Sequence, residues 1–146
     1  MRNTILIALV SLVIFSCKKD SFSTTPSLKY KSVNINQLFP GEVIKFKLSF
    51  TDAEGDLDSI YIEKVNPRCA KSRTVERFYL SDAIVKLNSK NDELLVSYGY
   101  RVDGYPLIGE PKCDFNDTCY FRFALLDKGK HKSDTVKSET IVIVKQ

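Results

Sequence analysis

The stretch Val43-Ile44-Lys45-Phe46-Lys47-Leu48-Ser49-Phe50-Thr51 alternates apolar and polar residues along its length. Its largest apolar residues occupy the even-numbered positions from Ile44 to Phe50, and its two lysines occupy odd-numbered positions. Successive side chains of a β-strand point to opposite faces, so this pattern predicts a strand with one buried and one solvent-facing side. No long stretch of the chain has the spacing of three and four that an amphipathic helix requires.

An acidic turn follows this strand directly. The residues Asp52-Ala53-Glu54-Gly55-Asp56-Leu57-Asp58 place four carboxylates around one glycine. Asp, Asn and Gly are the usual residues of tight turns, because Asp bonds its own backbone and Gly tolerates positive φ. A further strand is predicted at 59–65, with Ile60 and Ile62 on its buried face.

Short apolar or alternating segments recur through the rest of the chain, separated by turn residues such as Phe39-Pro40-Gly41-Glu42 and Asp103-Gly104. They predict strands at 30–38, 75–80, 83–87, 94–102, 119–126 and 136–144. The last of these is apolar on both faces, so we expect it to be paired with neighbours. About seven short strands with turns between them predict an all-β, antiparallel β-sandwich.

The N-terminus has the features of an export signal. Arg2 precedes an apolar run from Ile5 to Phe15, which is too short to span a bilayer comfortably. Its end, Ile14-Phe15-Ser16-Cys17, resembles the lipobox of bacterial lipoproteins. The resemblance implies that residues 1–16 are removed and that Cys17 becomes the first residue and carries the lipid, palmitate included. The alternative is an ordinary signal peptide that contains a cysteine.

This interpretation divides the chain into a signal peptide (1–16), a flexible tether (17–28) rich in Ser, Thr and Pro, and one domain (29–146). Removal of Arg2 leaves 21 basic against 18 acidic side chains. A surplus of three is too small to indicate nucleic-acid binding. We expect a monomer attached by its lipid to the membrane, with an envelope protein as a candidate partner. Lys18 follows Cys17 in place of an inner-membrane retention Asp, so we expect the outer membrane.

Two motifs carry a family resemblance. Phe50-Thr51-Asp52-Ala53-Glu54-Gly55-Asp56-Leu57 resembles the F-x-D-x-x-G-D signature of small lipoproteins common in Bacteroidetes, and the segment from Phe123 to Ser133 resembles their later apolar-Asp-x-Gly-x-x-Ser element. The resemblance implies a single immunoglobulin-like or cadherin-like domain, and most of these proteins have no assigned activity. In such a sandwich the loops after 43–51 and 119–126 emerge at the same pole.

The acidic turn allows two interpretations. Calcium binds six to eight oxygen ligands, so it is a candidate cofactor for a set of carboxylates that converge at this pole: Asp52, Glu54, Asp56, Asp58 and Asp127. An EF-hand is rejected because Leu57 stands where that loop requires Gly. The alternative is a capped turn without metal, whose charge is balanced by the basic residues of the facing loop, and we favour it.

Three cysteines remain after lipidation. Export permits disulfides, and strand order places Cys69 near Cys113 or Cys119, although a local Cys113–Cys119 bridge is the competing arrangement. Three thiols and one histidine at these spacings do not form a zinc site.

Candidates for catalysis or glycan binding are few. His131 is the only histidine, and its neighbours Ser133 and Asp134 do not give the arrangement of a catalytic triad. Tyr98, Tyr100 and Tyr105 are a candidate glycan platform, but Tyr98 and Tyr100 share the parity of core residues. The sequence therefore favours a non-enzymatic binding or structural protein of the cell envelope, with a Ca²⁺- or glycan-binding module as the alternative.

Overall fold

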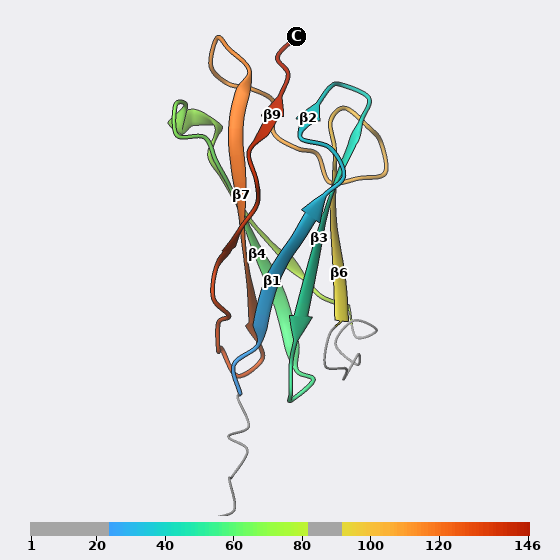
Figure 1. Ribbon diagram of the computed structural model, residues 1–146, viewed down its shortest axis with the longest axis vertical. Coiled ribbons are helices and arrows are strands. Elements are labelled where there is room, and N and C mark those ends of the chain that lie inside the picture. The colour runs from blue at the N-terminus through green and yellow to red at the C-terminus, as the bar shows by residue number, and fades with distance from the viewer. Residues whose placement is uncertain (1–23, 82–91) are drawn as a thin grey trace, which may run out of the picture.

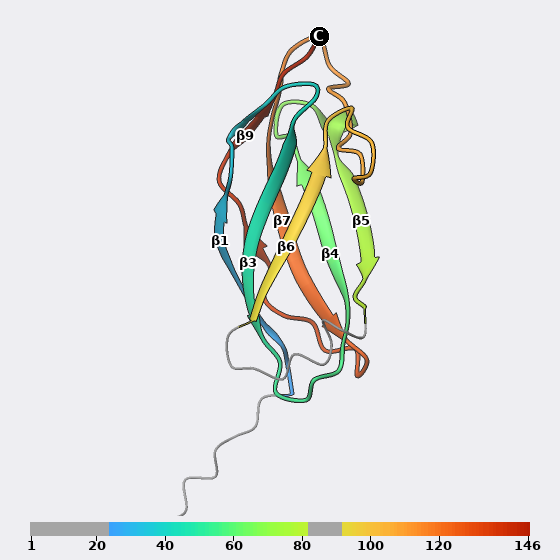
Figure 2. The same cartoon turned by 90° about the vertical axis from the view of Figure 1, so that its right-hand side faces the viewer.

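The computed structural model describes residues 24–81 and 92–146, which form two β-sheets packed face to face (Figure 1). One sheet has the order β1 (Ser27–Val33), β3 (Val43–Thr51), β6 (Asp92–Gly99). The other has the order β2 (Gln37–Leu38), β9 (Ile141–Ile143), β7 (Asp117–Asp127), β4 (Leu57–Val65), β5 (Thr74–Tyr79), and β8 (Val136–Lys137) also pairs with β7. The predicted all-β sandwich is confirmed, and Figure 2 shows β3 and β6 in front of β7 and β4.

All pairs of named strands in the described chain are antiparallel except β2 with β9. One short 3₁₀ helix, η1 (Ala70–Ser72), follows β4. Within the described ranges, no helix has the length and apolar character needed to cross a membrane.

The single first strand predicted at 30–38 is wrong, because the chain changes sheets there. β1 pairs with β3 in one sheet, whereas β2 pairs with β9 in the other. Asn34 lies at the crossing: its Nδ2 donates to the Val43 carbonyl at 3.0 Å and its Oδ1 accepts from the Lys45 amide at 2.6 Å. The Asn34 amide also donates to the Lys45 carbonyl at 3.1 Å, so the Asn34 side chain extends the pairing with β3 where the chain leaves the first sheet.

The closing strand predicted at 136–144 is also divided, into β8 and β9. Between them, the Ser138 amide donates to the Phe121 carbonyl at 2.8 Å, and the Ser138 hydroxyl accepts from the Phe121 amide at 2.9 Å. The hydroxyl takes the place of a carbonyl, so pairing with β7 continues through an irregular segment. β9 lies between β7 and β2, as expected for a paired apolar strand.

The remaining strands agree with prediction to within a few residues, and β1 begins at Ser27, two residues before the predicted start of the domain. The predicted strand 83–87, the signal peptide and Cys17 lie outside the described residues.

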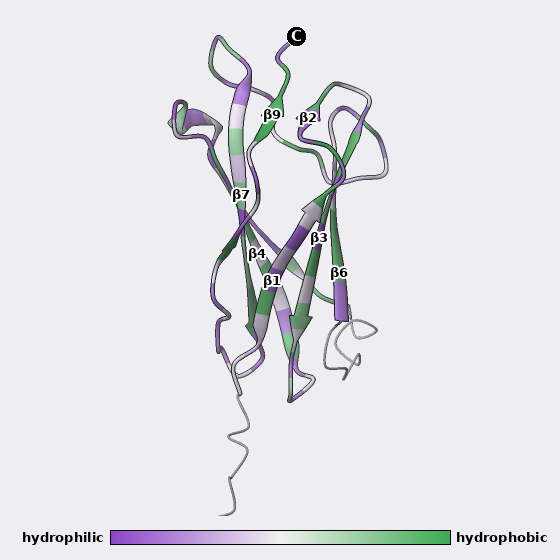
Figure 3. Ribbon diagram, viewed as in Figure 1, coloured by the Kyte–Doolittle hydropathy of each residue, from purple (hydrophilic) through white to green (hydrophobic). Residues whose placement is uncertain are grey.

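The core is formed by the alternate residues of each strand whose side chains point between the sheets. Figure 3 shows hydrophobic and hydrophilic residues alternating along β3 and β7. Phe46 of β3 has no exposed surface and packs against Phe121 and Phe123 of β7, with ring centroids 4.7 and 5.3 Å apart. Ile60 and Ile62 are both 2 % exposed, which confirms the buried face predicted for β4.

An ion pair is buried at the end of β4. Lys64 continues the inward parity of Ile60 and Ile62, and its Nζ lies 2.8 Å from Asp117 Oδ2 and 3.0 Å from the Gly109 carbonyl. The Lys64 and Asp117 side chains are each 1 % exposed. Asn66 Nδ2 donates to the other oxygen of Asp117. The cluster therefore joins β4, β7 and the loop between β6 and β7.

Replacing Lys64 with Met should lower the free energy of unfolding by about 3–5 kcal/mol, because Asp117 would remain buried without its cation. Adding Asp117→Asn should recover more than half of that loss, since the second change removes the uncompensated charge. Urea denaturation of both variants measures this. A single variant as stable as the parent protein would contradict the structure of the cluster.

Candidate functional site

The two loops predicted to share a pole lie side by side. Leu57 is paired with Asp127, and the Lys128 amide donates to the Asp56 carbonyl at 2.9 Å. In Figure 1 this is the lower end of the molecule, where β3 and β7 end and β1 begins. The acidic turn and the loop after β7 therefore form one pole of the domain.

Asp52 caps the acidic turn. One carboxylate oxygen accepts from the Glu54 amide at 3.3 Å, and the other accepts from the amides of Asp56 and Leu57 at 2.9 and 3.1 Å. Gly55 has a φ of 67°, a conformation that Gly adopts readily. Asp52 is 6 % exposed, so its carboxylate is a structural acceptor inside the turn.

Asp127 caps the opposing loop in the same manner. Its Oδ1 accepts from the His131 amide at 2.7 Å, and its Oδ2 lies 2.9 Å from His131 Nδ1. The Asp127 side chain has no exposed surface, whereas that of His131 is 45 % exposed. His131, for which the sequence showed no catalytic arrangement, is thus the partner of Asp127.

One oxygen of the Asp56 carboxylate lacks a partner. Its Oδ1 is buried and accepts no hydrogen bond within the described part of the chain. Burial, followed by repulsion from Asp127 and Asp52, raises the pKa of Asp56 above its ordinary 3.8, and His131 acts in the opposite direction. The pole therefore concentrates more negative charge than its own hydrogen bonds compensate.

Four of the five predicted calcium ligands lie together at this pole, and the fifth, Asp58, does not join them. Ligand atoms of Glu54, Asp127 and His131 lie within 4.8 Å of one another. Asp58 turns away to form an ion pair with Arg77 at 2.7 Å, and hydrogen bonds from Arg77 and Ser59 lower its pKa. Across the described residues, no ion pair joins the lysines of the facing loop to the acidic turn. The loops interact at longer range, since Lys128 acts to lower the pKa of Asp58 and His131 acts to lower that of Asp56.

The opposite pole contains the disulfide. Cys69 is bonded to Cys113, with Cα atoms 6.2 Å apart and a sequence separation of 44. Closing a loop of this length stabilises the fold by about 4 kcal/mol in the chain-entropy view. Cys119 is a free thiol on the inward face of β7, and burial raises its pKa to about 12. The bridge from Cys69 is therefore formed with the first of its two predicted partners.

The predicted tyrosine platform does not exist as a surface. Tyr98 and Tyr100 are 3 % and 1 % exposed, and their hydroxyls donate to Glu76 and to the Val144 carbonyl. Only Tyr105 of the three is exposed. The prediction that Tyr98 and Tyr100 belong to the core is therefore confirmed.

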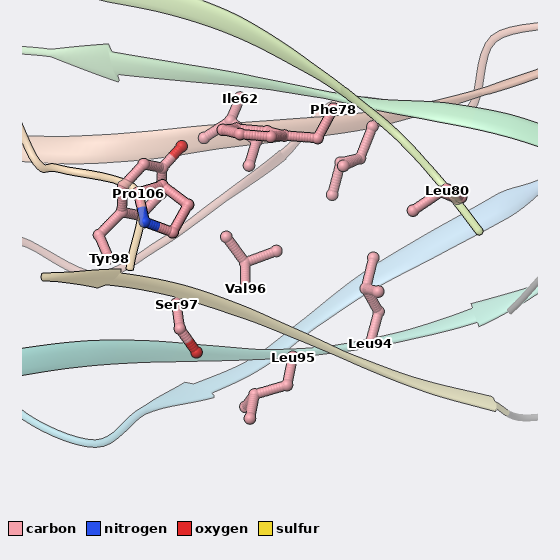
Figure 4. A pocket seen from close by; sticks show the side chains of 10 residues that line it. Ile62, Phe78, Leu80, Leu94, Leu95, Val96, Ser97, Tyr98 and Pro106 are labelled. Atoms are coloured by element: carbon pink, nitrogen blue, oxygen red, sulfur yellow. The ribbon is translucent and has the colours of Figure 1, made fainter. Parts of the chain in front are cut away.

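An apolar hollow of about 260 Å³ lies between β5 and β6, the edge strands of the two sheets. Figure 4 shows Leu94 and Val96 directed between the sheets toward Ile62 and Phe78, whereas Leu95 and Ser97 are directed away. The walls are side chains of the core, so the hollow marks the open lateral side of the sandwich.

Comparison with known proteins does not assign the chain to a family. No family model matches it, and no curated protein does so. Among solved structures, it is similar to a PKD domain of an M14-like peptidase from a Thermoplasmatales archaeon, with 15 % identity over 83 % of this chain and 94 % of that one and a TM-score of 0.44.

Two β-glucosidases also show similarity, one from Erythrobacter marinus and one from Listeria innocua. Each is 10 % identical over 82 % of this chain but only 16 % of its own length, with TM-scores of 0.42 and 0.34.

Replacing Asp56 with Asn should raise the thermal midpoint at pH 7 in the presence of EDTA. The raised pKa means that the folded protein binds this proton more tightly than the unfolded chain, so stability falls as pH increases above 3.8. The gain should disappear at about pH 3, where both states of the parent protein are protonated. Melting curves between pH 3 and 7 measure it, with Glu54→Gln as an exposed control from the same turn.

A pH-independent gain, or a lower midpoint for Asp56→Asn at neutral pH, would contradict the assignment of Asp56 as an uncompensated carboxylate.

Proposed function

We propose that this protein is a lipid-anchored, non-enzymatic binding module of a bacterial outer membrane. The observation that carries the proposal is the sequence Ile14-Phe15-Ser16-Cys17 at the end of an apolar leader, ten residues before the first strand of the sandwich. An acylated Cys17 supplies attachment, because each buried methylene of the lipid contributes about 0.8 kcal/mol.

The fold determines which pole of the domain would face the membrane if Cys17 is the anchor. Ten residues span at most about 35 Å when fully extended, and β1 begins at the pole that holds the acidic turn. That pole is therefore membrane-proximal in this proposal, and the Cys69–Cys113 pole is distal. Both outer sheet faces remain accessible to a partner in the envelope.

A non-enzymatic role agrees with the environment of His131. Its Nδ1 is committed to Asp127, and no Ser, Thr or Cys side chain in the described ranges is hydrogen-bonded to the imidazole. A nucleophile activated by a base requires that contact. The proposal therefore assigns His131 to the stability of its loop.

Cys17→Ser should abolish incorporation of labelled palmitate and move the protein from the membrane to the soluble fraction. Globomycin, which blocks lipoprotein signal cleavage, should cause the unprocessed form of the parent protein to accumulate. Ser16→Ala, which retains the thiol, is the matched control. Equal palmitate labelling of the parent protein and Cys17→Ser would remove the anchor from the proposal.

Calcium binding is the second candidate, and the unpartnered Asp56 Oδ1 is the observation that favours it. Asp56 and the exposed Glu54 are the carboxylates available for an ion, since Asp52 and Asp127 already accept backbone hydrogen bonds. Water would have to supply much of the coordination shell of six to eight oxygens. A site of this kind binds weakly.

Under this second candidate, calcium at millimolar concentration raises the thermal midpoint of the parent protein but not that of Asp56→Asn. Magnesium at the same concentration controls for ionic strength. A midpoint that does not change with calcium would eliminate the candidate and leave the turn as a capped structural element.

A further inference from the structure

The outward side chains of β5, β4, β7 and the segment after β7 lie in cross-strand rows. We call this surface the tyrosine–arginine face. The register aligns Val75, Glu63, Arg122 and Lys137 in one row, Arg77, Tyr61 and Ala124 in the next, and Tyr79, Ser59, Leu126 and Lys132 in the third. Neighbouring strands are about 4.8 Å apart. Ser59 and Ala124 of these rows are buried, and the longer side chains lie at regular intervals across the sheet.

This face carries a surplus of positive charge. Its cations are Arg73, Arg77, Arg122, Lys132 and Lys137, and its acids are Asp58 and Glu63. Glu63 lies between two of the arginines, 2.6 Å from Arg73 and 3.4 Å from Arg122. One carboxylate shared by two guanidinium groups leaves donors of both free to bind a further anion, because each guanidinium has five.

Aromatic rings hold the cations in place. The Arg77 guanidinium lies 4.7 Å from the ring centre of Tyr79 and 5.1 Å from that of Tyr61, and it is hydrogen-bonded to Asp58. Lys137 Nζ lies 3.9 Å from the ring centre of Tyr120. Tyr79 is 71 % exposed, so its ring also offers an apolar surface to a ligand.

A hollow of about 290 Å³ lies in the middle of the face. Ala124 is 3 % exposed and is the small outward residue between Tyr61 and the basic residues Arg122 and Lys132. Its methyl group leaves space that a larger side chain would fill. The hollow thus combines a ring, an apolar base and three cations: Arg122 of β7, Arg73 just before β5 and Lys132 in the segment after β7.

We propose that the tyrosine–arginine face binds an acidic polysaccharide, a polymer of uronate-type sugars. The guanidinium fork matches a carboxylate geometrically, and the face of a tyrosine ring packs against the C–H groups of a sugar. A polymer with a carboxylate on each unit engages several rows together. The proposal rests on the binding role proposed above and names the class of ligand.

The opposite sheet face provides a control within the same molecule. Its outward positions on β1, β3 and β6 include Lys29, Lys45 and Lys47, with Glu93 as an acid 2.9 Å from Lys47. These positions hold no aromatic residue among those that the structure describes. The two faces therefore share a positive charge but differ in rings and in the hollow.

The test uses the full chain in detergent micelles with EDTA and measures binding to polygalacturonate by calorimetry. Uncharged dextran and polyglutamate of matched charge are the comparison polymers. We expect binding to polygalacturonate and none to dextran. The double variant Arg122→Ala/Lys132→Ala should weaken that binding about tenfold or more, because it removes two charge-assisted contacts.

The control variant Lys29→Ala/Lys45→Ala removes the same charge from the opposite face and should change binding by less than about twofold. Equal losses in the two double variants would show nonspecific charge attraction and overturn the proposal. Equal binding to polyglutamate would also overturn the proposal, because it would indicate an acidic protein partner. The absence of polygalacturonate binding would overturn it as well. The palmitate test of Cys17 is independent of this result, so failure of the anchor and failure of the ligand are distinguishable.

Discussion

The contact of Phe46 with Phe121 and Phe123 is the interaction on which the rest of the structure depends. It joins the central strand of one sheet to the central strand of the other, across 75 and 77 residues of sequence. Because these rings are almost completely buried, they fix the inward parity of β3 and β7. Every outward position, including the rows of the tyrosine–arginine face, follows from that choice.

The two poles follow from the same packing. β3 and β7 end side by side, so the turns that leave them meet, and each turn is capped by its own aspartate. At the other end, Lys64 of β4 and Asp117 of β7 both point into the core, and their pairing compensates the cost of burial. The acidic pole keeps one buried carboxylate oxygen, Asp56 Oδ1, without a hydrogen bond from the residues that the structure describes.

Alternation in 43–51 predicted β3 correctly, since a period of two follows directly from strand geometry. The division at Asn34 was not predictable, because the hydrogen bonds of its side chain to β3 depend on which strand lies opposite. The partner of Cys69 could be narrowed to two residues, and the path of the loop that carries Cys113 decided between them. The position of Lys64, two residues after Ile62, predicts a side chain that points into the core, but nothing in the sequence indicated that Asp117 would be its buried partner. The exposed tyrosines were missed because Tyr61 lies on β4 and Tyr79 on β5, and the sequence does not show that these two strands are neighbours.

The central claim is that β3 packs on β7 through these rings. A nuclear Overhauser spectrum of the protein with labelled phenylalanine rings tests it most directly. The account predicts cross-peaks from the ring of Phe46 to the rings of both Phe121 and Phe123. Cross-peaks from Phe46 to other phenylalanine rings but to neither of these two would contradict the sandwich described above.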